Sequence, residues 1–261
     1  MTQGRSRVVS SFTIIKGSLI DETYAAFSTW DLTLPQTDNL QRIREENPIG
    51  ARSQNWLRDV IFVLSRRFDT DGRDRPLVEL AKARVDREVW KPLLLWHLTR
   101  DEFLVRDFLV NWLYLRFIEG TYNLGSGDVA AYLGTLAGRE GVEWSGAWTA
   151  ATTGRVASGL LRMAADFGLL TGGTMRRFAS YHLPEASFLY LAHAIAESEV
   201  GVGQLVASPE WHMYLLDRDD VERQLVHLHQ FRKLHYEVAG SLTQLTLPYR
   251  TAADYARELV A

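Results

Sequence analysis

The sequence predicts a mainly α-helical globular protein with two helix-turn-helix units, the second of which carries a small β-hairpin as a wing. Apolar side chains recur at spacings of three and four residues through most of the chain, and this spacing places them on one face of successive helices. Glycine and proline separate these helical segments. Two short segments, at 169–181 and 234–247, instead have the turn composition of β-hairpins.

Length and composition indicate a soluble protein with a sizeable core. The 261 residues are 46% hydrophobic and 23% charged, ordinary values for a globular protein. The net charge of −3 argues against a general polyanion binder, so a nucleic-acid surface would have to be a local basic patch. Cysteine is absent, which excludes disulfides and fits a cytoplasmic location. No apolar run approaches the length of a membrane span.

Residues 1–120 are expected to form an N-terminal helical subdomain. Its helices are expected at residues 17–30, 39–46, 53–68, 77–85, 86–98 and 101–118. The last two contain many large apolar side chains, such as Trp90, Trp96 and Phe108, which we assign to the central core. A glycine-containing turn at 120–127 is the expected junction with the second half.

The first helix-turn-helix unit is expected at about residues 39–68. The segment Asn47-Pro48-Ile49-Gly50 ends its first helix, because proline disfavours a helical residue before it and glycine suits a turn. The second helix would bury one apolar stripe, formed by Leu57, Val60, Ile61, Leu64 and Phe68. Short helix, turn and helix with a polar outer face is the pattern of a DNA-binding unit.

The outer face of that second helix supplies the first candidate DNA contacts. Arginine can grip guanine and asparagine can grip adenine through two hydrogen bonds each. The candidates are Arg52, Gln54, Asn55, Arg58 and Arg66. A solvated basic face is the alternative interpretation, and Asp59 counts against DNA binding because it would repel phosphate.

Residues 121–261 are expected to form a C-terminal helical subdomain, with a winged helix-turn-helix at about 128–182. Its helices are expected at 128–137, 144–168, 184–197, 217–231 and 251–260. Trp144-Ser145 is a helix-start signal, because a serine side chain can accept a free amide of the first turn. Gly168 permits the helix to end. The turn Thr171-Gly172-Gly173-Thr174 would connect the two strands of the wing.

The helix at 144–168 supplies the second set of candidate contacts. Val156, Leu160, Met163 and Phe167 form its apolar stripe. The opposite face is small at its beginning and basic later, so it could enter the major groove, while arginines of the wing could meet phosphate. The candidates are Arg155, Ser158, Arg162, Arg176 and Arg177. An ordinary packing unit is the alternative interpretation of this stretch.

An ordered set of short segments resembles a known family over nearly the whole chain. The segments are Lys16-Gly17-Ser18-Leu19 with Glu22, Glu46-Asn47 and Gly50 before Arg52, Trp144-Ser145, Asp166-Phe167-Gly168-Leu169-Leu170, Leu183-Pro184, Leu216-Asp217, Asp220-Val221-Glu222-Arg223 and Gly240-Ser241. Together they resemble the BrxA family, a core component of BREX (bacteriophage exclusion) defence systems.

The resemblance implies a soluble, monomeric, helical protein with two helix-turn-helix units that binds double-stranded DNA without known enzymatic activity. It also implies a DNA methyltransferase, an ATPase and a phosphatase-like protein as BREX partners. It does not identify the side chains that touch DNA, so those above come from the helical faces alone.

Other chemistry finds little support in the sequence. Asp166-Phe167-Gly168 has no accompanying phosphate loop, and His227 and His229 have poor spacing for a metal. We therefore expect no catalytic site, cofactor or metal. Two alternatives stay open, namely a protein-interaction adaptor built on a winged-helix scaffold, which the acidic total favours, and a nuclease built from dispersed carboxylates.

Overall fold

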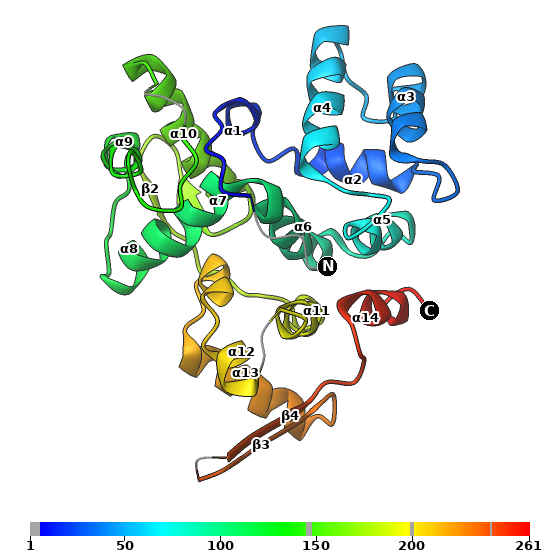
Figure 1. The fold of residues 1–261 in the computed structure, drawn as a ribbon, viewed down its shortest axis with the longest axis vertical. Coiled ribbons are helices and arrows are strands. Elements are labelled where there is room, and N and C mark those ends of the chain that lie inside the picture. Colours follow the sequence, from blue (N-terminus) through cyan, green and yellow to red (C-terminus); the bar gives the residue numbers. More distant parts are fainter. Residues whose placement is uncertain (1–5, 145–147, 199–200, 241) are drawn as a thin grey trace.

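The computed structural model describes residues 6–144, 148–198, 201–240 and 242–261, and Figure 1 shows that helices dominate this part of the chain. The first half contains α1 (Phe12–Lys16), α2 (Ile20–Ser28), α3 (Gln36–Glu46), α4 (Gln54–Arg67), α5 (Arg75–Lys82), α6 (Arg87–Asp101), α7 (Phe103–Asp107), the π-helical η1 (Phe108–Leu113) and α8 (Tyr114–Ile118). The second half contains α9 (Ser126–Gly134), α10 (Ala150–Asp166), α11 (Glu185–Ala196), α12 (Val202–Val206), the 3₁₀-helical η2 (Pro209–Tyr214), α13 (Arg218–Gln230) and α14 (Ala252–Glu258).

Two antiparallel hairpins complete the described residues, so the predicted mainly α fold is confirmed. β1 (Leu170–Gly172) pairs with β2 (Arg176–Phe178), and β3 (His235–Ala239) pairs with β4 (Leu242–Thr246). Leu124 adds a single bridge to the first hairpin, because it exchanges two backbone hydrogen bonds of 2.9 Å with Arg176. No helix among the described residues is long and apolar enough to cross a membrane.

The predicted helix, turn and helix at 39–68 are present as α3 and α4, which pack against each other. Asn47 ends α3 in the left-handed region (φ 47°), where its side chain bonds both backbone groups of Ala51. Ser53 begins α4, since its hydroxyl accepts the amide of Trp56 at 3.2 Å. The predicted apolar stripe of α4 is buried.

The expected start of the second candidate helix is wrong. α10 begins at Ala150, because the Thr149 hydroxyl accepts the amide of Thr152 at 3.2 Å and provides the cap. Trp144 lies before the helix and packs on Trp148 with ring centroids 5.0 Å apart. Ser145 and Ala147, which were expected at the start of the helix, lie outside the described residues.

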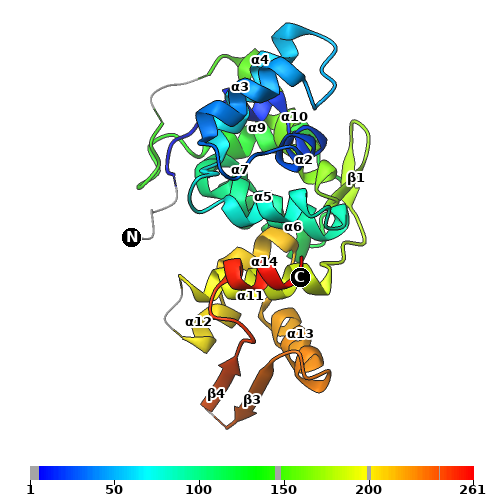
Figure 2. The same ribbon diagram turned by 90° about the vertical axis from the view of Figure 1, so that its right-hand side faces the viewer.

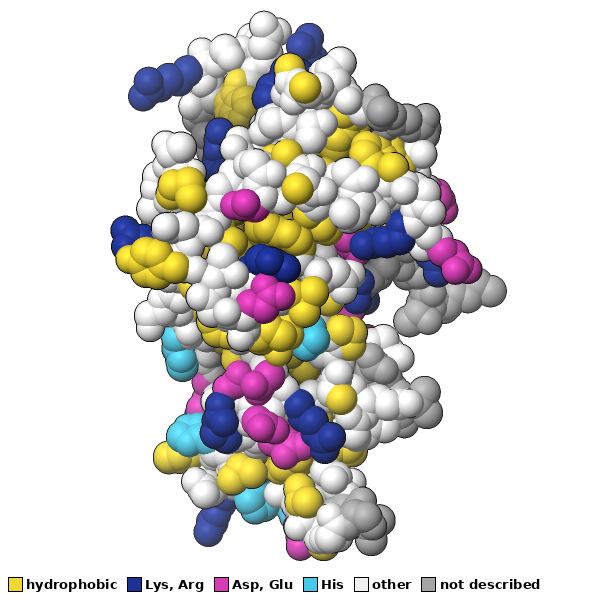
Figure 3. Space-filling view, turned by 90° about the vertical axis from the view of Figure 1, so that its left-hand side faces the viewer, with side chains coloured by type: hydrophobic (Ala, Val, Ile, Leu, Met, Phe, Trp, Pro, Cys, Tyr) yellow, Lys and Arg dark blue, Asp and Glu magenta, His cyan; other side chains and the backbone are white. Residues whose placement is uncertain are grey.

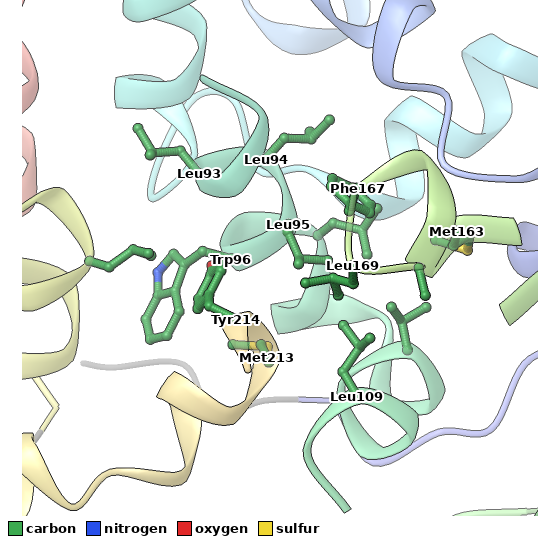
Figure 4. Close-up of a cluster of buried hydrophobic side chains, with 14 of the residues drawn as sticks. Leu93, Leu94, Leu95, Trp96, Leu109, Met163, Phe167, Leu169, Met213 and Tyr214 are labelled. Carbon is green, nitrogen blue, oxygen red and sulfur yellow. The ribbon is translucent and has the colours of Figure 1, made fainter. Parts of the chain in front are cut away.

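The expected helix at 101–118 is present from Phe103 to Ile118 as α7, η1 and α8, which follow one another without a gap. The boundary with the preceding helix lies at Glu102 rather than after residue 98, because α6 continues to Asp101 and Glu102 then leaves the helical region (φ −98°, ψ 78°). At this bend the Glu102 carboxylate forms a buried ion pair with Arg67. Close by, Leu95, Leu109 and Phe167 belong to a core that joins α6, η1 and α10 (Figure 4).

The C-terminal helix returns to the first half of the chain. α14 packs on α5 and on α11, and α11 packs on α6. Figure 2 shows α11 and α14 between the upper helices and the lower hairpin of β3 and β4. The two halves of the chain on either side of residue 120 therefore pack against each other, and their division into two subdomains stays a prediction.

Candidate nucleic-acid interface

The outer face of α4 presents its polar side chains to solvent. Arg52, Arg58 and Arg66 are exposed, as are Gln54 and Asn55. Within the described ranges, none of these three arginines forms an ion pair. The guanidinium of Arg66 lies over the ring of Phe62, itself 46% exposed, at 5.9 Å from its centroid. This face can therefore offer several uncompensated positive charges.

The acidic residue that counted against this face is neutralised in the structure. The Nζ of Lys16, from α1, lies 2.5 Å from the Oδ2 of Asp59 on α4. Both side chains are partly buried, so solvent screens the pair less than it would screen a fully exposed one. Repulsion of phosphate by Asp59 is correspondingly reduced.

α10 exposes the second predicted group. Arg155, Ser158 and Arg162 are all exposed, and neither arginine has an acidic partner in the part of the chain that the structure describes. Arg155 makes one long hydrogen bond, of 3.4 Å, to the Thr152 hydroxyl. Asp166, at the end of α10, accepts the Ser18 hydroxyl at 2.6 Å.

The two arginines of the first hairpin are held by neighbouring groups. Arg176 is half-buried and its guanidinium donates to the Gly172 carbonyl. Arg177 is exposed, donates to the Tyr122 hydroxyl at 2.9 Å and lies 5.5 Å from the centre of that ring. Arg177 can therefore reach a ligand beside Tyr122, whereas Arg176 contributes mainly to the turn.

Sequence reasoning missed the segment that joins the two helices. α1 lies between α4 and α10 (Figure 1) and packs on both. Arg67, only 1% exposed, binds this segment through its carbonyls: Nη2 donates to Thr13 and Gly17 at 2.9 Å each, and Nη1 donates to Ser18 at 3.2 Å. Its Nε bonds Glu102 at 3.0 Å. Periodicity carries no signal for such contacts, because they join residues far apart in the chain.

Charged side chains are unevenly distributed over the surface. In the face that Figure 3 shows, the upper end is mostly neutral, with a few Lys and Arg side chains and hardly any acids among them. The lower half of that face mixes Asp and Glu with Arg and His. The net negative charge of the chain therefore coexists with an end that is poor in acids on this face, and α4 and α10 lie at that end of the molecule (Figure 1).

A cavity of about 730 Å³ lies between α5, α6, α11 and α14. His97 lies at its wall, and both of its ring nitrogens form hydrogen bonds: Nδ1 with Asp74 at 2.6 Å and Nε2 with the Tyr190 hydroxyl at 2.8 Å. Burial lowers the pKa of His97, against the opposing effect of the Asp74 carboxylate. No group of three or more metal-ligating side chains occurs in the described residues. We therefore assign the hydrogen-bonded group of Asp74, His97 and Tyr190 a structural role in the core.

Comparison with known proteins identifies the family. Neither the curated proteins nor the solved structures contain a match to the chain. The model of the BrxA family matches residues 11–194, a range that begins just before α1 and ends within α11. Because this match covers more than half of the sequence, the chain belongs to the BrxA family of BREX phage-defence components.

Proposed function

We propose that this protein binds double-stranded DNA through α4 and α10 and catalyses no reaction, serving as the DNA-binding component of a BREX system. One observation carries the proposal: both helices bury an apolar stripe and expose arginines without acidic partners in the described chain. Helices with this division of faces can enter a major groove and contact the flanking phosphates. Other BREX components are its partners by family membership.

Phosphate contacts should dominate the affinity. Arg52, Arg58, Arg66, Arg155 and Arg162 are the proposed phosphate and guanine contacts, and Arg177 extends them from the wing. Gln54, Asn55 and Ser158 lie beside them and supply neutral hydrogen bonds to bases or phosphates. Arg176 keeps a smaller role, because its guanidinium is engaged by the turn. Since charge pairing with phosphate is insensitive to sequence, we expect tolerant binding.

A salt series measured by fluorescence anisotropy tests the proposal. The logarithm of affinity should fall linearly with the logarithm of salt, with a slope that corresponds to roughly four to eight phosphate contacts. Combined Arg155→Ala and Arg162→Ala should weaken binding to every duplex and lower the slope. Combined Arg218→Ala and Arg223→Ala on α13 is the control, because it removes the same charge from a distant helix. Binding that ignores salt, or that both double variants weaken equally, would contradict the proposal.

A protein-interaction adaptor is the second candidate function, and one observation favours it. Large apolar side chains are exposed around α8 and the first hairpin: Leu115 at 43%, Ile118 at 58%, Tyr122 at 69% and Met175 at 49%. Exposed apolar groups that gather in this way are typical of protein contacts. Ile118→Ser with Met175→Ser should then abolish co-purification with the BREX methyltransferase, ATPase or phosphatase-like protein while DNA binding stays unchanged. We propose that the protein itself is a monomer, which light scattering can measure.

A further inference from the structure

We infer that the segment 12–18 fixes α4 and α10 as two parts of one surface, which binds a single DNA duplex. This inference rests on the proposed function and adds the mode of binding. It also assigns Lys16 and Ser18 as positioning residues, because Lys16 pairs with Asp59 of α4 and Ser18 holds the carboxylate of Asp166 on α10.

Contacts of α1 with α4 are both apolar and ionic. Phe12 meets Phe62 edge to face with ring centroids 5.1 Å apart, and Lys16 pairs with Asp59 at 2.5 Å. Phe62 and Asp59 border the outer face of α4, close to Arg58 and Arg66 in the helix. α1 therefore lies along the edge of the proposed DNA-binding face rather than behind it.

α1 approaches α10 so closely at Gly159 that a side chain there would be tightly packed. A Cβ atom at Gly159 would lie 3.0 Å from the Ile14 carbonyl oxygen and 3.1 Å from its Cγ2. Gly159 follows Ser158 and precedes Arg162 by three residues, so this approach also borders the proposed DNA-binding face. The Arg67 guanidinium holds the α1 backbone from α4, which connects both helices through one short segment.

The segment 12–18 also bonds the single acidic side chain of each helix. Asp59 is the only acid of α4 and Asp166 the only acid of α10. Asp166 follows Arg162 by four residues, a spacing at which oppositely charged side chains are neighbours on a helix and can pair. It accepts the Ser18 hydroxyl instead, at 2.6 Å, and Arg162 stays without an acidic partner in the described chain. Lys16 thus neutralises the charge of Asp59, and Ser18 keeps the carboxylate of Asp166 from pairing with Arg162.

A rigid connection has a direct consequence for binding. If α4 and α10 cannot move independently, the second helix meets the duplex that the first has bound at a high effective concentration. One protein should then bind one duplex through both helices. Independent helices would instead allow one protein to join two separate duplexes.

Energy transfer between labelled duplexes tests the binding mode. Duplexes of about 15 and about 30 base pairs, roughly one and a half and three helical turns, carry a donor or an acceptor dye and are mixed with limiting protein. We expect no transfer with either length and one protein per 30-base-pair duplex at saturation. Transfer between duplexes would overturn the single-duplex inference while leaving DNA binding intact. Absence of any binding at low salt would overturn the proposed function, and this inference with it.

Substitution of Lys16 tests the charge role. Lys16→Met should weaken binding about tenfold, because it exposes Asp59 to phosphate. Adding Asp59→Asn should restore affinity to within about twofold of the unmodified protein, since it removes the acid that Lys16 neutralises. The matched control is Lys233→Met, which frees Glu185 far from α4 and should change nothing. A double variant as weak as the single one would show that Lys16 contacts DNA itself and would overturn the assignment.

Substitution of Ser18 tests the other helix. Ser18→Ala should free Asp166 to pair with Arg162 and lower the salt slope by about one phosphate contact. Adding Asp166→Asn should restore the slope. Thermal unfolding of each variant separates loss of charge from loss of fold. An unchanged slope in Ser18→Ala would overturn the role of Ser18.

Discussion

Gly159→Ala should separate helix propensity from the contact between α10 and α1. Gly154 and Gly159 lie in the same helix, and both would gain from replacement because alanine favours helix over glycine by about 1 kcal/mol. An added Cβ at Gly154 meets nothing within 4 Å. At Gly159 it lies 3.0 Å from a backbone oxygen of Ile14, and backbone cannot swing aside as a long side chain can.

The magnitudes follow from this difference. Gly154→Ala should raise the free energy of unfolding by about 1 kcal/mol. Gly159→Ala gains the same amount and loses roughly 1–3 kcal/mol through overpacking, because Arg67 holds the Ile14 turn in place. Gly159→Ala should therefore be no more stable than the unmodified protein, and less stable than Gly154→Ala by the overpacking cost.

Urea unfolding followed by circular dichroism provides the measurement. The two variants are compared with the same dependence of the unfolding free energy on urea concentration. Equal stabilisation at both positions would refute the reasoning, because it would show that α1 yields freely and does not fix α10. DNA affinity gives a second measurement. Displacement of α1 by Gly159→Ala should weaken binding, whereas Gly154→Ala should leave the position of α1 unchanged.

Three further predictions concern stability. Arg67→Met should lower the free energy of unfolding by roughly 3–5 kcal/mol, because it leaves the Glu102 carboxylate buried and unpaired; adding Glu102→Gln should recover part of the loss in urea unfolding. Burial lowers the pKa of His193 to about 4 from its ordinary 6.5, and neither ring nitrogen has a hydrogen-bond partner in the described chain. The imidazole of His193 is therefore protonated more readily in the unfolded chain than in the folded one. Its contribution to the free energy of unfolding is complete above pH 6.5, is lost as the pH falls towards 4, and amounts to at most about 3 kcal/mol. His193→Phe should flatten the measured dependence of stability on pH. Thr149→Ala should cost about 1 kcal/mol, measured by thermal unfolding, because it removes the cap of α10.

Local features allowed much of the fold to be predicted from the sequence. The helical pair α3 and α4 was predicted correctly because Asn47, Gly50 and Ser53 act on their own neighbours, and both hairpins follow from turn composition. The start of α10 was misplaced for a related reason. Two hydroxyl residues, Ser145 and Thr149, precede that helix, and composition does not decide which of them accepts a free amide of its first turn. In the structure Thr149 does so.

Long-range contacts were beyond the reach of these rules. The five-residue helix α1 is too short to show periodicity, and its position depends on Arg67 and on the absence of a side chain at Gly159. Arg66 and Arg67 are adjacent in α4, yet Arg67 is buried and Arg66 is exposed. The candidate arginines could be chosen from helical faces, whereas the engagement of Asp59 and Asp166 required three-dimensional structure.

Net charge is a poor guide to this surface because the arrangement of charges decides what is free. Within α13 and α14, arginines have acids three or four residues away and pair with them. α4 contains no acid at those spacings from Arg58, and in α10 the single candidate, Asp166, bonds Ser18. An arginine paired within its own helix adds little to a distant phosphate, whereas an unpaired one adds its full charge. A chain with a charge of −3 can therefore present a positive face, provided that its acids pair with bases elsewhere or are bonded by neighbouring segments.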